Sequence, residues 1–370
     1  MTSVSDYRVL TRHFDPHVHG RRGPMREVLL KQAAKRMCGG ILEPNTNPHI
    51  YTYEELERYV AVANALTPGC RWSGSIYLAP HTSYADVYGA WERHLLGHVK
   101  GYPPHGTTHS DESVPSEMLL DINSNPGKVL AAMAEAGIPF KTHGEVVEKG
   151  GRQVHPLERE TLWYREVQPR FDDLYRTRGL RQIHAHITSK DAADYIRKNG
   201  DTDARVAELT GHHLLWDWNA LFDGGALRPD HHWLPASKDE ENTEALRQLV
   251  RDRLECVMAA SDMAGHDTRQ KYAARAFGGG YTYHCSLELY VQVLEMLRVL
   301  DFADAFLYRH ARRFHKDLVP DELTAKTFAL AREDWTVDER VSYEGGEMTP
   351  FGFDEDPAKR LVFRWKLVEN

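Results

Sequence analysis

Histidine is frequent in this chain, with 21 copies among 370 residues, and several copies stand beside other side chains that can bind metal ions. His17 and His19 are two residues apart at the end of an apolar run, so on a strand both would point to the same face. Two imidazoles on one face can share a divalent ion. The alternative is a pair of interior polar residues held by hydrogen bonds. The spacing predicts half of a metal site, provided that other ligands converge on it.

Lys100 ends another short apolar run and could contribute to such a site in an unusual way. A free lysine amine would repel metal ions, and out of context it is expected to be a surface charge. Reaction of the amine with CO2 gives a carbamate, whose two oxygens can bridge two cations. Metal binding would stabilise this otherwise reversible adduct, because ligand binding and protonation state are linked.

Three further candidates follow apolar runs: His143, His186 and Asp262. Either histidine could instead be a hydrogen-bonded core residue, and His184 has the same strand parity as His186, so spacing alone leaves both open. Asp262 could be a helix N-cap. Beside two metal ions its carboxylate could bind one of them and accept a proton from an activated water.

The elements that must position these residues alternate between short apolar runs and longer helix-like stretches. Eight strand candidates cover residues 9–19, 40–43, 73–78, 98–102, 139–145, 182–188, 213–218 and 256–262. Helix candidates between them cover residues 25–38, 53–66, 84–96, 126–136, 189–198 and 244–254. This alternation predicts an α/β fold with a parallel sheet closed into a (β/α)8 TIM barrel, whose reactive groups lie at the carboxyl ends of the strands. We expect residues 1–370 to form one domain, with C-terminal helices and a tail packed on the barrel.

Composition excludes several classes of protein. The formal net charge of −8 argues against a non-specific nucleic-acid binder, and no apolar run is long enough to span a membrane. Residues 1–10 lack a signal pattern, which predicts a cytoplasmic protein. The four cysteines, Cys38, Cys70, Cys256 and Cys285, have no paired spacing, so free thiols are expected rather than disulfides or a zinc–cysteine cluster.

Four segments resemble the amidohydrolase superfamily, and within it the dihydroorotases of the single-function bacterial type. They are residues 15–21, residues 43–48, residues 99–103 with the pair 107–108, and residues 186–195. The last segment is the most specific, and it favours His186 over His184 as a ligand.

This resemblance implies a zinc centre with two metal ions bridged by a carboxylated Lys100. The more buried ion would be held by His17, His19, Lys100 and Asp262, and the more exposed ion by Lys100, His143 and His186. The substrate's carboxylate would be bound by Arg21, Asn45 and His266, and Thr107 and Thr108 would donate hydrogen bonds from a mobile loop. Without the resemblance, Arg21 could form a surface salt bridge, Asn45 could be a turn residue, and the two threonines could lie on an exposed turn. The resemblance also implies a homodimer.

The implied activity is reversible hydrolysis of dihydroorotate to N-carbamoyl-aspartate in pyrimidine synthesis. Three departures put the exact substrate in doubt: Glu43 replaces a methionine, and the segments 260–266 and 274–280 differ from the family pattern. The alternatives are another cyclic-amide hydrolase, directed at hydantoins or lactones, and a catalytically silent scaffold partner. A mononuclear deaminase is disfavoured because it needs no lysine on the fourth strand.

Overall fold

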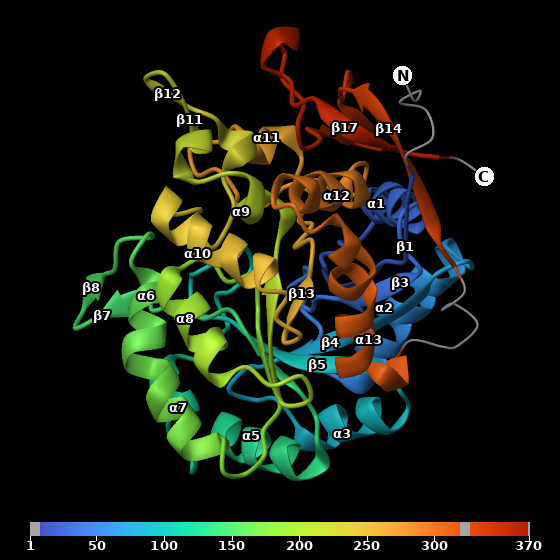
Figure 1. Cartoon of the computed structure of the whole chain (residues 1–370). Coiled ribbons are helices and arrows are strands. Elements are labelled where there is room, and N and C mark those ends of the chain that lie inside the picture. The colour runs from blue at the N-terminus through green and yellow to red at the C-terminus, as the bar shows by residue number, and fades with distance from the viewer. Residues whose placement is uncertain (1–7, 319–325, 369–370) are drawn as a thin grey trace.

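Eight parallel strands form the centre of the computed structural model, which describes residues 8–318 and 326–368 (Figure 1). The order of hydrogen-bonded neighbours is β13-β10-β9-β6-β5-β4-β3-β2. These strands are β2 (Phe14–Val18), β3 (Gly39–Leu42), β4 (Arg71–Tyr77), β5 (Leu96–Gly101), β6 (Phe140–Thr142), β9 (Gln182–His184), β10 (Arg205–Leu209) and β13 (Val257–Ala259). The predicted TIM barrel is confirmed. Residues 1–7, part of the N-terminal stretch used to predict the compartment, lie outside the described residues.

The seam of the barrel lies between β2 and β13, the two ends of this strand order. The backbone N–H of His19 donates to Met263 O at 3.0 Å and closes the seam just beyond β13. One oxygen of the buried Asp15 carboxylate accepts from the backbone N–H groups of His17 at 3.0 Å and Ser261 at 3.1 Å. These bonds bring the end of the first barrel strand against the segment that carries Asp262.

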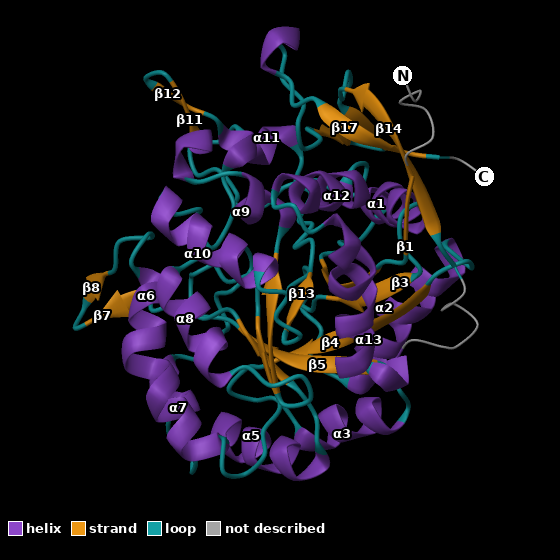
Figure 2. Cartoon of the chain, in the orientation of Figure 1, coloured by secondary structure: helices purple, strands orange, loops and turns teal. Residues whose placement is uncertain are grey.

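Helices surround the barrel (Figure 2). The longer ones are α1 (Pro24–Ala34), α2 (Tyr53–Leu66), α3 (Tyr84–Glu92), α5 (Asn125–Ala136), α7 (Gln168–Tyr175), α8 (Lys190–Asn199), α10 (Glu240–Arg251) and α12 (Ser286–Met296). Local sequence sets their ends: Thr52 and Glu55 form a capping box at α2. Ser124 caps α5, and Gly137 with φ of 72° ends it. The six predicted helices are all present, with shifts of a few residues at their ends.

The seventh predicted strand is wrong. Residues 213–218 contain part of a short helix, α9 (Gly211–Leu215), whose cap Thr210 accepts from the backbone N–H of His213. The seventh barrel strand is β10, which lies earlier in the chain. A short apolar run cannot be assigned to strand or helix from periodicity alone. In addition, Arg205 and Glu208 interrupt the apolar pattern of β10, although both side chains are buried.

A smaller antiparallel sheet lies beside the barrel, near the N-terminus. The predicted first run, residues 9–19, is in fact two strands: β1 (Arg8–Thr11), which pairs with β14 (Phe328–Trp335), and β2. β14 also pairs with β17 (Phe363–Leu367), and β17 packs against α12. The other short α-helices and β-strands are α4 (Ser116–Leu119), α6 (Arg159–Leu162), α11 (Thr268–Lys271), α13 (His310–Phe314), β7 (Glu148–Lys149), β8 (Arg152–Gln153), β11 (Phe222–Asp223), β12 (Ala226–Leu227), β15 (Val341–Tyr343) and β16 (Gly346–Met348). Among the described residues, none of the helices has the length and apolar character to span a bilayer.

Candidate active site

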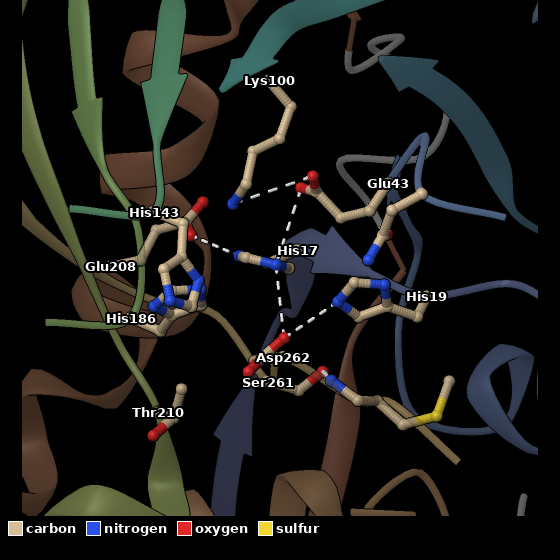
Figure 3. Close-up of polar contacts among 12 residues, drawn as sticks. His17, His19, Glu43, Lys100, His143, His186, Glu208, Thr210, Ser261 and Asp262 are labelled. Carbon is tan, nitrogen blue, oxygen red and sulfur yellow. Dashed lines mark hydrogen bonds and ion pairs between the residues drawn. The ribbon is translucent and has the colours of Figure 1, made fainter. Parts of the chain in front are cut away.

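His17, His19 and Asp262 form a compact group of possible metal ligands at the barrel seam (Figure 3). The Oδ1 atom of Asp262 lies 3.3 Å from His17 Nε2 and 3.0 Å from His19 Nε2. All three side chains are buried. Imidazole nitrogen and carboxylate oxygen atoms are ligands that zinc accepts. The spacing of His17 and His19 predicts that both side chains point to the same face, and both rings do face Asp262.

Lys100 lies near the end of β5 and points into the barrel interior, toward this group (Figure 3). Its side chain is fully buried, and its Nζ atom has no hydrogen-bond partner. The Nζ atom lies 3.9 Å from Glu43 Oε2. Burial lowers the pKa of Lys100 to about 8. The surface position that a lone lysine would ordinarily take is excluded.

His143 and His186 follow β6 and β9, in the loops rather than within the strands. His143 Nδ1 lies 3.2 Å from His186 Nε2, and the ring centroids of His17 and His186 are 5.0 Å apart. The alternative ligand His184 instead contacts the Tyr164 hydroxyl through Nδ1, at 2.9 Å. The geometry therefore brings His186, and not His184, to the group around His17.

The unpaired nitrogen atoms of these side chains fit a metal centre. His17 Nε2, Lys100 Nζ and His186 Nδ1 are buried and have no hydrogen-bond partner. Burial, followed by the effect of nearby lysines for His17 and of His143 for His186, holds the pKa of both imidazoles well below its usual value. They are therefore neutral, which is the form of imidazole that binds metal ions. An unpaired buried nitrogen is costly, and a bound cation would satisfy it.

The predicted substrate-binding residues lie around the same site. All predicted site residues except Lys100 line one cavity. Arg21 donates through Nε to Gly265 O at 2.9 Å, and its Nη2 lies 3.0 Å from His266 Nε2. Asn45 Nδ2 donates to Thr108 O at 3.1 Å, while Asn45 Oδ1 is buried without a partner.

Three of these residues have backbone conformations that are rare for side chains other than glycine. The φ angle is 54° at Arg21, 34° at His186 and 44° at Asp262. Such conformations cost free energy and cluster at functional sites, where the surrounding structure holds them. Here they turn the chain directly after three barrel strands and aim the side chains at one cavity.

Sequence reasoning missed two buried residues beneath the site, Lys141 and Glu208. Glu208 Oε2 lies 2.7 Å from His17 Nδ1, and Lys141 Nζ lies 2.6 Å from Glu208 Oε1 and 2.7 Å from Glu43 Oε1. Burial would raise the pKa of Glu43, but Lys100 and Lys141 hold it well below its usual value, so this carboxylate is ionised. The sequence signal for such residues is a charged side chain within a strand. It was available for Lys141, but Glu208 lies on β10, which was not predicted as a strand.

Comparison with known proteins identifies the family. The dihydroorotase of Nitrosomonas europaea is 30% identical over 375 residues, which cover 100% of both chains. The dihydroorotase of Methylobacillus flagellatus is 32% identical over 351 residues, 92% of this chain and 94% of the relative. No family model matches.

Solved structures share the fold. The structure of Saccharomyces cerevisiae dihydroorotase in complex with 5-fluoroorotic acid matches with a TM-score of 0.85 and 21% identity over 98% of both chains. The L-hydantoinase of Arthrobacter aurescens matches with a TM-score of 0.73 and 14% identity, over 90% of this chain and 78% of that one. Together with the sequence identity along the whole chain, this establishes that the protein belongs to the dihydroorotase family, a group of metal-dependent cyclic amidohydrolases.

Proposed function

We propose that this chain catalyses the reversible hydrolysis of (S)-dihydroorotate to N-carbamoyl-L-aspartate, in de novo pyrimidine synthesis. One observation carries the proposal: Arg21 and His266 lie on the wall of the same cavity that His17, His19 and Asp262 line. The site thus combines a set of metal ligands with a guanidinium that can bind a carboxylate. Dihydroorotate carries both a cyclic amide and a carboxylate.

Two divalent ions, most simply zinc, complete the proposed centre, with Lys100 carboxylated by CO2. His17, His19, Lys100 and Asp262 would hold one ion, and Lys100, His143 and His186 the other. Such ions activate water and polarise the amide carbonyl. The buried, unpaired nitrogens of Lys100 and His17 support this assignment.

The chain's own residues bind the substrate and move the proton. Arg21 can pair with the substrate's carboxylate through a forked set of donors, and Asn45 and His266 lie in the same cavity to support it. Thr107 and Thr108, also on its wall, would donate hydrogen bonds to the bound ligand. Asp262 would take a proton from the attacking water and pass it to the departing ring nitrogen. Fixed placement of the carboxylate would supply part of the rate.

The direct test measures how fast the zinc-loaded protein hydrolyses dihydroorotate and compares this rate with the rates for a panel of hydantoins and lactones. We expect dihydroorotate to be the preferred substrate by kcat/KM. Preference for a hydantoin without a carboxylate would identify the enzyme as a different cyclic-amide hydrolase. A protein that binds no zinc and turns over none of the compounds would be the silent scaffold.

Replacement of Arg21 by methionine should weaken recognition of the substrate's carboxylate. The variant keeps an unbranched side chain but loses the guanidinium and its charge. We therefore expect kcat/KM for dihydroorotate to fall roughly 10- to 150-fold, the equivalent of a lost charged hydrogen bond of about 1.5–3 kcal/mol. Steady-state kinetics on both substrate classes measures the effect. Any residual hydantoin turnover serves as the internal control and should be unchanged. An unchanged kcat/KM for dihydroorotate would exclude Arg21 from carboxylate binding.

A further inference from the structure

A buried ionic network lies directly beneath the candidate metal centre, and its middle member is Lys141 on β6. The Nζ atom of Lys141 lies 2.7 Å from Glu43 Oε1 and 2.6 Å from Glu208 Oε1, and it donates to Pro16 O at 3.0 Å. The side chains of Lys141, Glu43 and Glu208 are all fully buried. A lysine ammonium has three protons to donate. Lys141 donates to Glu43 Oε1 and to Pro16 O, and it forms an ion pair with Glu208. Lys141 therefore holds Glu208 and helps to hold Glu43, whose Oε1 also lies 3.1 Å from His98 Nε2.

The other oxygen of each carboxylate faces a candidate metal ligand (Figure 3). Glu208 Oε2 lies 2.7 Å from His17 Nδ1. Glu43 Oε2 lies 3.9 Å from Lys100 Nζ and accepts a hydrogen bond from the Tyr102 hydroxyl at 3.4 Å. The network thus reaches from β6 to one ligand on β2 and to another on β5.

The contact with Glu208 has a defined effect on His17. When Nδ1 carries the proton and donates to Glu208, the lone pair of Nε2 is free, and Nε2 is the atom that faces Asp262 at 3.3 Å without a hydrogen-bond partner. A carboxylate behind a metal-binding histidine fixes its tautomer and ring orientation and raises its basicity. Glu43 has the corresponding place beside Lys100, whose Nζ is also unpaired.

Stability alone is a poor reason for such a network. Burying two carboxylates and an ammonium costs desolvation free energy, and apolar side chains of similar volume often stabilise a protein interior as well or better. The segment 43–48 resembles a family segment that begins with methionine, so an apolar side chain suits the position of Glu43. The charges therefore call for a role in the adjacent site.

We propose that Lys141 is a positioning residue of the metal centre, which holds Glu208 behind His17 and Glu43 beside Lys100. This inference rests on the proposed metal centre. It predicts a different effect on metal binding for each of the two carboxylates. Glu208 acts on His17, which would bind only the more buried ion. Glu43 lies 3.9 Å from Lys100 Nζ, which would bridge both ions, and 3.8 Å from His17 Nε2.

The test measures zinc binding by the full-length protein in competition with a chromophoric chelator. Glu208→Gln should weaken one of the two binding steps, and Glu43→Gln should weaken both. Lys141→Met should weaken both as well, because it removes the cation that pairs with Glu208 and one of the groups that hold Glu43. We expect losses of about 10- to 100-fold in affinity, the usual effect of removing a partner that orients a metal ligand.

The control is Glu160→Gln, a buried carboxylate that accepts hydrogen bonds from Thr188 rather than from a candidate ligand. It should leave both zinc affinities unchanged. If Lys141→Met fails to fold, the two glutamine variants decide, because they preserve side-chain shape and the capacity to accept hydrogen bonds.

The inference would be overturned if Glu43→Gln and Glu208→Gln both bound zinc with wild-type affinity at both steps. A lowered free energy of unfolding in these variants would then show that the network is purely structural. If Glu208→Gln lowered zinc affinity equally at both binding steps, Glu208 would not act on the more buried ion alone. Failure of the wild-type protein to bind zinc would instead overturn the proposed metal centre.

Discussion

Lys100→Ala abolishes nearly all turnover of dihydroorotate if the proposed centre is correct. Lys100 would supply the group that bridges both ions, and its fully buried position leaves little room for another residue to replace it. We expect kcat to fall about 10³-fold or more, corresponding to about 4 kcal/mol or more of lost transition-state stabilisation. The zinc content of the purified protein should fall with it, and elemental analysis measures this second readout.

Lys190→Ala provides the matched control, because Lys190 is an exposed lysine at the start of α8 that pairs with Asp194. It should retain wild-type turnover and zinc content. Full activity in Lys100→Ala would refute the two-ion centre for any cyclic-amide substrate.

Asp262→Asn should lower kcat while the protein still binds substrate. Asparagine preserves the shape of the side chain but cannot accept and return a proton, and general acid–base groups contribute about 10²- to 10⁴-fold to rate. KM should change much less than kcat, because the carboxylate-binding residues Arg21 and His266 are untouched. Steady-state kinetics with a parallel zinc determination separates the loss of proton transfer from the loss of metal.

For this variant the control is Asp191→Asn, a carboxylate at the surface of α8 that pairs with Arg165. It should behave as wild type. A kcat in Asp262→Asn within a few-fold of wild type would show that another group carries the proton.

The barrel, and the convergence of most candidate site residues on one cavity, could be predicted from the sequence because the information is local. Strand parity places His17 and His19 on one face, and short runs followed by capped helices mark most of the βα units. Pairing across the seam is different, since His19 meets Asp262 from 243 residues away along the chain. That contact was expected only because parallel strands of a barrel end at one rim.

The network beneath the site could not be predicted in the same way. Glu43 stood out in the sequence as a departure from the family pattern, but nothing local indicates that Lys141 and Glu208 lie beside it. Their contacts depend on side chains from β6, from β10 and from Glu43 just after β3. The wrong seventh strand also removed Glu208 from consideration. The homodimer and the cytoplasmic location stay predictions.

The two sides of the barrel seam come from distant parts of the chain, β2 and β13. The candidate ligands His17 and His19 lie at the end of the first barrel strand, whereas Asp262 follows the last one, and the bonds of Asp15 and His19 join the two. A growing or partly folded polypeptide therefore has an incomplete set of candidate metal ligands until its final βα unit docks. Ion capture would thus mark the completion of the barrel, and the captured ion would in turn lock the first and last units together.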